Sequence, residues 1–264
     1  MTVPADADFD PSAILDRIAA ATGHLLLAAE QLTEAEVRGP SLLPGWSRGH
    51  VLTHLARNAD GGRHLLFWAR TGVETPEYPS PAARAEQIEA GAGRGAAALV
   101  ADLRDSSARF AEEYRRMPAE AWQRTVRWTQ GHERPAARAA DSRLSEVLVH
   151  HVDLNVGYPP AQWPADFVHA MLGRVVAALR ARGDTPAMRL RPTGAEAGNG
   201  NGSGARAGIG AGGSDAVYDL GGAPDAPVVR GPRHALLAWL MGRSPGADLS
   251  VEGGAVLPEP PFLY

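Results

Sequence analysis

Glu146 and His150 stand four residues apart in the segment Glu146-Val-Leu-Val-His150. Residues at positions i and i+4 of an α-helix lie on the same face, about one turn apart. A carboxylate and an imidazole at that spacing can both bind a borderline divalent ion such as Zn²⁺. Because such pairs also arise by chance on solvated helix faces, the spacing alone is a weak indication of a metal site.

The residues around this pair are apolar, which strengthens the metal interpretation. Six aliphatic residues leave the segment little polar surface: Leu144, Val147, Leu148, Val149, Val152 and Leu154. A carboxylate in such surroundings needs a partner, because burying it alone is costly. A metal ion is one such partner for Glu146, and an arginine side chain is the ordinary alternative.

A third ligand has to come from another helix, and His54 is the best candidate. It lies in the apolar segment Val51-Leu-Thr-His-Leu55, whereas His50 is one turn earlier and nearer the start of its helix. His151 is rotated about 100° from His150 around the helix axis and is expected to face elsewhere. A histidine that is merely hydrogen-bonded in the core is the alternative for His54.

The absence of two residue types narrows the chemistry. The chain has no cysteine and no lysine, so its basic side chains other than histidine are all arginine. A disulfide scaffold, a CxxC metal site, a protein thiol nucleophile and a Schiff-base lysine are therefore excluded. Three ligands without cysteine are typical of a catalytic zinc site with one open position. Because zinc can deprotonate a bound thiol, we hypothesise that an external thiol is the cofactor.

Several helices must position these residues. Hydrophobic spacing and capping residues predict helices from Pro11 to before Gly39-Pro40, from Ser47 to about Arg70 and from Ser80-Pro81 to about Met117. A short fourth helix, capped by Asp141 or Ser142, is predicted from Leu144 to about Val156. Glycines at 91, 93 and 95 weaken the third helix, where we expect a kink or a break. Residues 118–140 are expected to be irregular and anchored by Trp122 and Trp128. Four helices joined in this way can form a bundle with an inward-facing site.

A second domain is predicted after Pro159-Pro160. One more helix is expected from about Pro164 to Arg182, followed by short strands at Met188–Arg191, Ala216–Leu220, Ala226–Arg230 and Leu249–Val251, with a helix beginning at Pro232. The segment 194–214 is rich in Gly, Ala, Asn and Ser and is expected to be a loop or insertion. The fold class is therefore α+β, with helical residues 1–160 and a small α/β domain at 161–264.

Two motifs resemble a known family. The segment Leu43-Pro-Gly-Trp-Ser-Arg-Gly-His-Val-Leu-Thr-His-Leu-Ala-Arg-Asn58 is similar to the N-terminal motif of the mycothiol-dependent maleylpyruvate isomerases. The segment Leu144-Ser-Glu-Val-Leu-Val-His-His-Val-Asp-Leu-Asn-Val-Gly-Tyr158 resembles their second motif. These enzymes belong to the wider DinB-like group of four-helix metal proteins. A weaker similarity, to their C-terminal helix, covers Leu237-Ala-Trp-Leu-Met-Gly-Arg243.

The resemblance implies a site and a reaction. The zinc ligands of the family fall on His54, Glu146 and His150, and the required arginine of a sterol-carrier-like C-terminal domain is matched to Arg243. Arg230 and Arg233 lie nearby, and the Gly-rich segment 194–214 departs from the family pattern. The implied mechanism is addition of the mycothiol thiolate to a cis double bond, rotation and elimination, which converts maleylpyruvate into fumarylpyruvate. An arginine fork suits the carboxylates of this anionic unsaturated substrate.

Four further residues are candidates for lesser roles. Asp153 lies about one turn after His150 and is a candidate to orient a ligand histidine, with capping or an arginine pair as the alternatives. Trp46, Arg57 and Asn58 are the cofactor-binding candidates. The ordinary alternatives are packing against the helix start for Trp46 and a solvated helix face for Arg57 and Asn58.

Charge and composition limit the partners and the location. The formal net charge of −4 argues against a nucleic-acid-binding protein. No targeting segment or apolar run of 18 residues is evident, so a cytoplasmic protein without a membrane span is expected. A monomer is kept as one option for the oligomeric state. Besides the isomerase, two classes stay open: a mycothiol S-transferase acting on another electrophile, in detoxification or secondary metabolism, and a non-catalytic DinB-like metal-binding stress protein.

Overall fold

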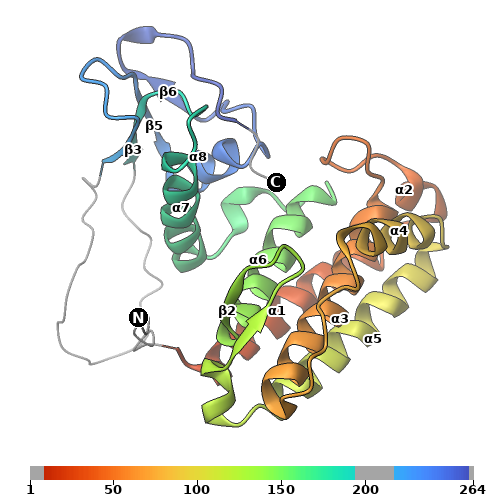
Figure 1. Cartoon of the computed structure of the whole chain (residues 1–264). Coiled ribbons are helices and arrows are strands. Elements are labelled where there is room, and N and C mark those ends of the chain that lie inside the picture. The colour runs from red at the N-terminus through yellow and green to blue at the C-terminus, as the bar shows by residue number, and fades with distance from the viewer. Residues whose placement is uncertain (1–8, 194–216, 262–264) are drawn as a thin grey trace, which may run out of the picture. The chain divides into compact units, whose positions relative to one another are not determined.

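The computed structural model describes residues 9–193 and 217–261. The chain divides into two compact units, Met1–Tyr158 and Pro159–Tyr264. The first unit is helical, whereas the second combines helices with a small sheet (Figure 1), so the predicted α+β class is confirmed. The Gly-rich segment 194–214, predicted to be a loop or insertion, lies outside the described residues.

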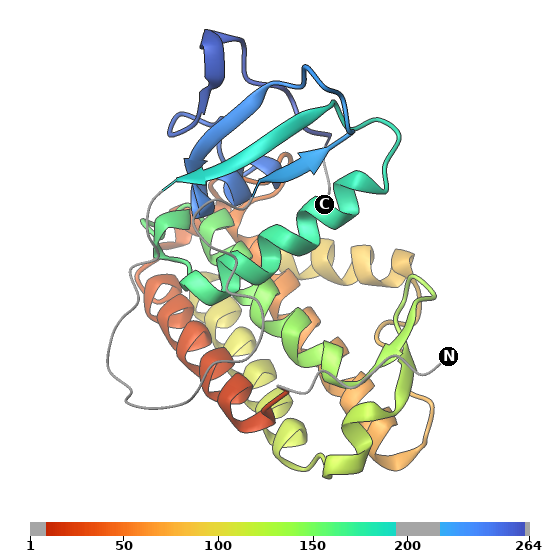
Figure 2. The ribbon, with the colours of Figure 1, turned by 90° about the vertical axis from the view of Figure 1, so that its left-hand side faces the viewer.

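Four long helices form the framework of the first unit: α1 (Pro11–Ala29), α3 (Arg48–Thr71), α5 (Ala96–Arg115) and α6 (Ala137–Asp153). Both α1 and α3 contact α5 and α6, and the pair α1 and α6 lies side by side (Figure 2). The shorter helices are α2 (Glu34–Arg38) and α4 (Pro81–Ala92), and α4 packs on α3. A short 3-10 turn at Ala119–Gln123 precedes a two-stranded antiparallel hairpin, β1 (Thr125–Arg127) and β2 (Glu133–Pro135).

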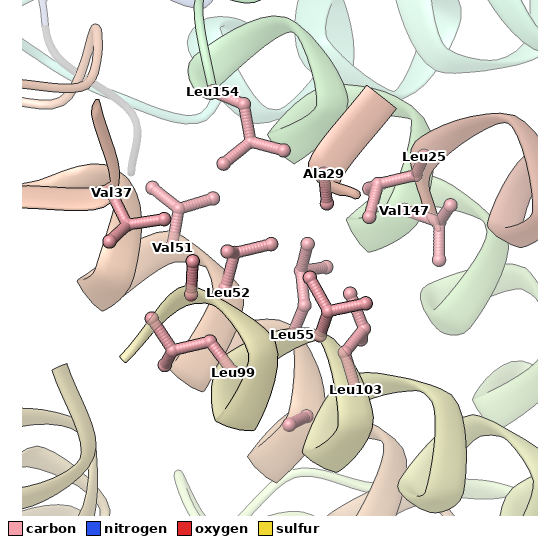
Figure 3. Close-up of a cluster of buried hydrophobic side chains, with 13 residues drawn as sticks. Leu25, Ala29, Val37, Val51, Leu52, Leu55, Leu99, Leu103, Val147 and Leu154 are labelled. Atoms are coloured by element: carbon pink, nitrogen blue, oxygen red, sulfur yellow. The ribbon is translucent and has the colours of Figure 1, made fainter. Parts of the chain in front are cut away.

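Aliphatic side chains from these helices share one buried core, shown in Figure 3. Leu52 and Leu55 on α3 meet Leu25 on α1, Leu103 on α5 and Val147 on α6, and each of these side chains is at most 1% exposed. Burial of one such leucine stabilises the fold by roughly 1.5–3 kcal/mol. This core fixes α3 against α6, the two helices that carry the histidines and the glutamate singled out above.

The start of α3 agrees with the prediction. The Ser47 hydroxyl accepts a hydrogen bond from the backbone N–H of His50, while the His50 ring accepts one from the backbone N–H of Ser47. This reciprocal pair satisfies two backbone donors at the N-terminus of the helix. At the other end Gly72 adopts φ = 78°, a left-handed conformation that glycine tolerates better than other residues.

Two predicted helix boundaries are wrong. The first helix ends at Ala29, and a separate helix, α2, begins after a capping box formed by Thr33 and Glu36. The last helix of the unit begins at Ala137, before Asp141 and Ser142, so part of the stretch expected to be irregular is helical. Alanine-rich residues 136–140 favour helix strongly enough to start α6 without a side-chain cap among the described residues. The predicted break between 91 and 95 is confirmed, because α4 ends at Ala92 and α5 begins at Ala96.

The second unit contains a four-stranded sheet in the order β4-β3-β5-β6. Its strands are β3 (Met188–Thr193), β4 (Tyr218–Leu220), β5 (Val228–Pro232) and β6 (Ser250–Val251). The central pair, β3 and β5, is parallel, and both outer pairs are antiparallel. Helices α7 (Ala165–Arg180) and α8 (Arg233–Leu240) contact each other and the strands, and they cover one face of the sheet (Figure 2). Short 3-10 turns lie at Pro160–Gln162 and Glu252–Gly254.

Helix α1 is, by length and composition alone, apolar enough to cross a membrane, and no other helix of the described residues is. The core helix of a water-soluble domain passes the same test, so the finding is weak evidence for a membrane span. Here α1 contacts α5 and α6, and its residues Leu25 and Ala29 belong to the shared core.

The contact between α3 and α4 is unusually close. A Cβ atom added to Gly49 on α3 would lie 2.3 Å from the backbone oxygen of Ala92, and one added to Gly91 would lie 2.5 Å from the Thr53 Cγ2 atom. Because neither position has room for a methyl group, these glycines set the distance between the two helices. That distance determines how near α4 comes to His54.

Replacing Gly49 by Ala should therefore destabilise the protein by about 1–3 kcal/mol, since a backbone oxygen rather than a flexible side chain must move. Chemical denaturation followed by circular dichroism measures the change. The matched control is Gly23→Ala on α1, where no described atom beyond the adjacent helix backbone lies within 4 Å of the added Cβ. The control should gain about 0.5–1 kcal/mol. Equal stability of the Gly49 variant and the parent would contradict the proposed close contact.

Candidate metal centre

Two helices bring three potential ligand atoms together. His54 lies in the second turn of α3, and Glu146 and His150 lie one turn apart in the second half of α6. The His54 Nε2 atom is 2.8 Å from Glu146 Oε2 and 3.0 Å from His150 Nε2, and the remaining pair, His150 Nε2 and Glu146 Oε2, is 3.2 Å apart. The three residues predicted as ligands therefore converge on one point.

These residues fit a divalent metal ion. Two imidazole nitrogens and one carboxylate oxygen form a donor set that zinc accepts, with ligand bonds of about 2.0–2.2 Å. In a tetrahedron of that size two ligand atoms are about 3.3 Å apart. The observed separations of 2.8–3.2 Å are slightly shorter, so the three side chains need only spread a little to hold an ion. Three protein ligands leave one tetrahedral position for a further group.

Burial and mutual contact determine the charges of the site. The His54 side chain is 4% exposed, and burial, together with the charge of His150, lowers its pKa to about 4. Burial also opposes ionisation of Glu146, but hydrogen bonds from His150 and His54 outweigh it and hold its pKa well below the usual value. The site therefore presents a neutral His54 beside an ionised Glu146.

Asp153 contacts the outer nitrogen of a ligand histidine. Its Oδ2 atom is 2.8 Å from His150 Nδ1, and the aspartate is completely buried. Burial lowers the pKa of His150, but the contacts with Asp153 and Glu146 outweigh that effect and raise it to about 9. A carboxylate behind a ligand histidine orients the ring and increases its basicity. The contact with His150 is the one that the orienting role expected for Asp153 requires.

Arg84 contacts the outer nitrogen of the other histidine. Its Nη2 atom on α4 is 3.0 Å from His54 Nδ1, and its guanidinium carbon lies 5.8 Å from the centre of the Tyr78 ring. Because a guanidinium can only donate, the His54 Nδ1 atom is the acceptor in this contact. Sequence analysis did not identify Arg84, since no local pattern links a residue of α4 with a histidine thirty positions earlier.

The three cofactor-binding candidates occupy different surroundings. The Trp46 ring packs edge-on to His54 with 5.7 Å between ring centres, and it also covers part of the hydrophobic core. Arg57 forms ion pairs with Asp60 and Asp102. Asn58 accepts a hydrogen bond of 2.9 Å from Arg143. Among the three, Trp46 contacts a ligand histidine, and the described contacts of Arg57 and Asn58 are with other side chains.

The other histidines of the two motifs face elsewhere. His50 caps α3 through Ser47 and reaches Glu89 with 3.1 Å between His50 Nε2 and the carboxylate. His151 is buried and stacks on Tyr158, with ring centres 3.9 Å apart and the planes within 1° of each other. Both positions agree with the sequence analysis, which preferred His54 to His50 as the third ligand and expected His151 to face away from His150.

Arg143 was also missed, although it lies directly before the second motif, which begins at Leu144. It is 2% exposed, and its guanidinium donates to the Leu55 carbonyl at 2.8 Å, to Asn58 and to the Ser107 hydroxyl. The arginine alternative considered for Glu146 predicted a direct pair, but Arg143 donates to neutral oxygens on α3 and α5. Burial lowers the pKa of Arg143 to about 10, so it remains a cation at neutral pH. This side chain ties α6 to α3 and α5 one turn before Glu146.

The three arginine candidates belong to the second unit, and their positions are given relative to other residues of that unit. Arg243 follows α8 and donates a hydrogen bond of 2.7 Å to the Met241 carbonyl. Arg230 on β5 lies 3.4 Å from Glu252. Arg233 begins α8. The role assigned to Arg243 therefore remains a prediction.

Comparison with known proteins gives family matches along most of the chain. The model of the mycothiol maleylpyruvate isomerase N-terminal domain matches residues 6–155, and that of the MDMPI C-terminal domain matches residues 162–260. A crystal structure of the mycothiol-dependent maleylpyruvate isomerase is 27% identical and covers 99% of this chain and 100% of its own, with a TM-score of 0.84. The structure of a histidine-to-alanine mutant of that isomerase is 26% identical, with the same coverage and TM-score. No curated protein matches the sequence.

Metal binding to this site should depend on pH, because the ion must replace the proton of His150. Since the pKa of His150 is about 9, the zinc affinity should rise about tenfold for each pH unit between about pH 6 and 8. Competition with a chromophoric chelator measures it. Asp153→Asn should flatten this dependence and weaken binding about 10–100-fold at pH 8.

The control for that substitution is Asp184→Asn, because Asp184 pairs with Arg182 at an exposed position of the second unit. Its zinc affinity should equal that of the parent at every pH. A zinc affinity of the parent that is constant from pH 6 to 8 would show that His150 does not exchange a proton for the metal.

Proposed function

The chain belongs to the mycothiol maleylpyruvate isomerase family, and on this premise we propose that it is a zinc- and mycothiol-dependent cis–trans isomerase of the maleylpyruvate type. The observation that carries the proposal is the convergence of His54, Glu146 and His150. The similarity to the isomerase structure over 99% of the chain supports the same assignment.

Three side chains would hold the ion, and their surroundings prepare them for it. The ligand atoms would come from His54, Glu146 and His150, with Asp153 keeping the His150 ring in place. A bound zinc ion and mycothiol would together supply a thiolate that adds reversibly to the double bond of the substrate, so that the bond can rotate. The ring of Trp46 packs against His54 and limits access of water to that side of the site.

Anion recognition is assigned to arginine. A guanidinium binds a carboxylate through two parallel hydrogen bonds, which suits a substrate with two carboxylates. We keep Arg243 as the residue that forms this fork, with Arg230 and Arg233 as the alternatives, and Trp46, Arg57 and Asn58 as candidates to contact the thiol. Residues 1–160 would serve as the metal-binding domain and 161–264 as a sterol-carrier-like domain. A cytoplasmic location suits an enzyme that uses a small intracellular thiol.

Turnover assays with and without mycothiol test the proposed function. Maleylpyruvate and a set of other electrophiles would be incubated with the zinc-loaded protein, while free thiol and both isomers are measured. Isomerisation without net loss of thiol supports the proposal. Stoichiometric consumption of thiol would instead indicate an S-transferase, and inertness with every electrophile a non-catalytic metal-binding protein.

Two substitutions separate metal binding from substrate binding. His150→Ala should abolish both zinc retention and activity, because it removes one of three protein ligands. Arg243→Lys should leave the zinc content unchanged but raise the KM for the substrate about tenfold or more, because lysine cannot form the two-point contact. Elemental analysis and steady-state kinetics measure the two effects. Stoichiometric zinc in the His150 variant, or parental kinetics in the Arg243 variant, would contradict the respective role.

A further inference from the structure

The outer nitrogens of the two ligand histidines face groups of opposite kind. His150 Nδ1 faces the carboxylate of Asp153 at 2.8 Å, whereas His54 Nδ1 faces the guanidinium of Arg84 at 3.0 Å. A carboxylate accepts hydrogen bonds and a guanidinium donates them. Asp153 therefore accepts a hydrogen bond from His150, whereas Arg84 donates one to His54.

This difference matters because a neutral imidazole carries a single N–H proton. While Arg84 donates to His54 Nδ1, the proton lies on Nε2, where it faces Glu146 Oε2 at 2.8 Å. A metal ion on Nε2 needs that nitrogen free, so the proton has to lie on Nδ1. Nδ1–H and the Arg84 N–H would then be two donors facing each other, and this contact cannot persist.

Tyr78 lies next to Arg84 and can bind an anion together with it. The Tyr78 ring lies beside its guanidinium, and Tyr78 is 6% exposed. The Tyr78 hydroxyl is buried beside the Arg84 guanidinium and has no other hydrogen-bond partner among the described residues. Burial raises the pKa of Tyr78, so its hydroxyl keeps its proton and can donate. A guanidinium and a buried hydroxyl donor side by side are suited to an anionic oxygen, such as that of a carboxylate.

We propose that Arg84 is a metal-responsive anion-binding residue, which contacts His54 while the metal is absent and binds a carboxylate together with Tyr78 once the metal is bound. The close contact of Gly49 with Ala92 and of Gly91 with Thr53 keeps α4 near enough for this exchange. The identification of the anion as a substrate carboxylate rests on the proposed function. The mutual exclusion of the Arg84–His54 contact and metal binding does not rest on the proposed function.

The exchange couples the two ligands. An anion that holds Arg84 away from His54 must strengthen metal binding, and by thermodynamic linkage the metal must strengthen anion binding by the same factor. Metal content and substrate occupancy would then reinforce each other in the full chain.

Zinc affinity of the full-length protein tests the first half of the proposal. Chelator competition would compare the parent with Arg84→Met, which keeps the side-chain volume but removes the donor and the charge. We expect about tenfold tighter zinc binding by this variant, because no hydrogen bond has to be broken. Arg94→Met is the matched control, since Arg94 lies just beyond α4 and contacts Asp102 and the Gly91 carbonyl. Its zinc affinity should equal that of the parent.

Fumarate tests the second half, because its two carboxylates point apart and cannot chelate one ion. In the parent, fumarate should raise the zinc affinity, and Arg84→Met should abolish this effect. Nitrogen NMR of the histidine rings gives a readout independent of affinity: the His54 proton should move from Nε2 to Nδ1 when zinc binds. None of these measurements requires turnover, so they remain decisive even if the protein is not an isomerase.

Three results would overturn the proposal. Zinc binding by Arg84→Met that is unchanged or weaker would show that Arg84 does not compete with the metal. A fumarate effect that survives in Arg84→Met would place the anion elsewhere. A loss of thermal stability in Arg84→Met without tighter zinc binding would indicate a merely structural role for the contact.

Discussion

The structure of the site depends on one partly buried carboxylate that lies between two imidazoles. Glu146 lies on an apolar helix, where an unpaired charge would be costly, and it contacts His54 and His150. This arrangement requires α3 and α6 to hold a fixed spacing, which the aliphatic core and the buried Arg143 maintain. The donor set that makes the site fit for a metal is thus also the one that allows Glu146 to be ionised inside the domain.

The two histidines have the same ring but different environments, and this divides their roles. Contacts with Asp153 and Glu146 raise the pKa of His150 to about 9, whereas burial lowers that of His54 to about 4. On binding a metal, one imidazole would therefore give up a proton, while the other would only have to move its proton from one nitrogen to the other. A site built in this way can bind an ion with the release of a single proton.

The sequence predicted those parts of the site that obey local rules. The spacing of Glu146 and His150 and the apolar context of His54 were sufficient to select three residues that the fold brings together. The Ser47 cap and the glycine break after α4 follow from equally local chemistry. The start of α6 was misplaced because helix propensity outweighed the absence of a cap. Arg84 could not be found, since its contact with His54 depends on how closely α4 packs on α3.

The arginines around the site differ in the groups that they contact, and this difference affects which of them can bind an anion. Arg57, Arg94 and Arg109 face the carboxylates of Asp60 and Asp102, and Arg143 is held by neutral oxygens in the core. Carboxylate partners persist whether or not a metal is bound, so these cations have little to offer an incoming anion. The imidazole nitrogen that faces Arg84 is different, because a metal on the opposite nitrogen removes its capacity to accept. In a chain without lysine, this dependence makes Arg84 the cation of the helical unit whose availability follows the state of the metal centre.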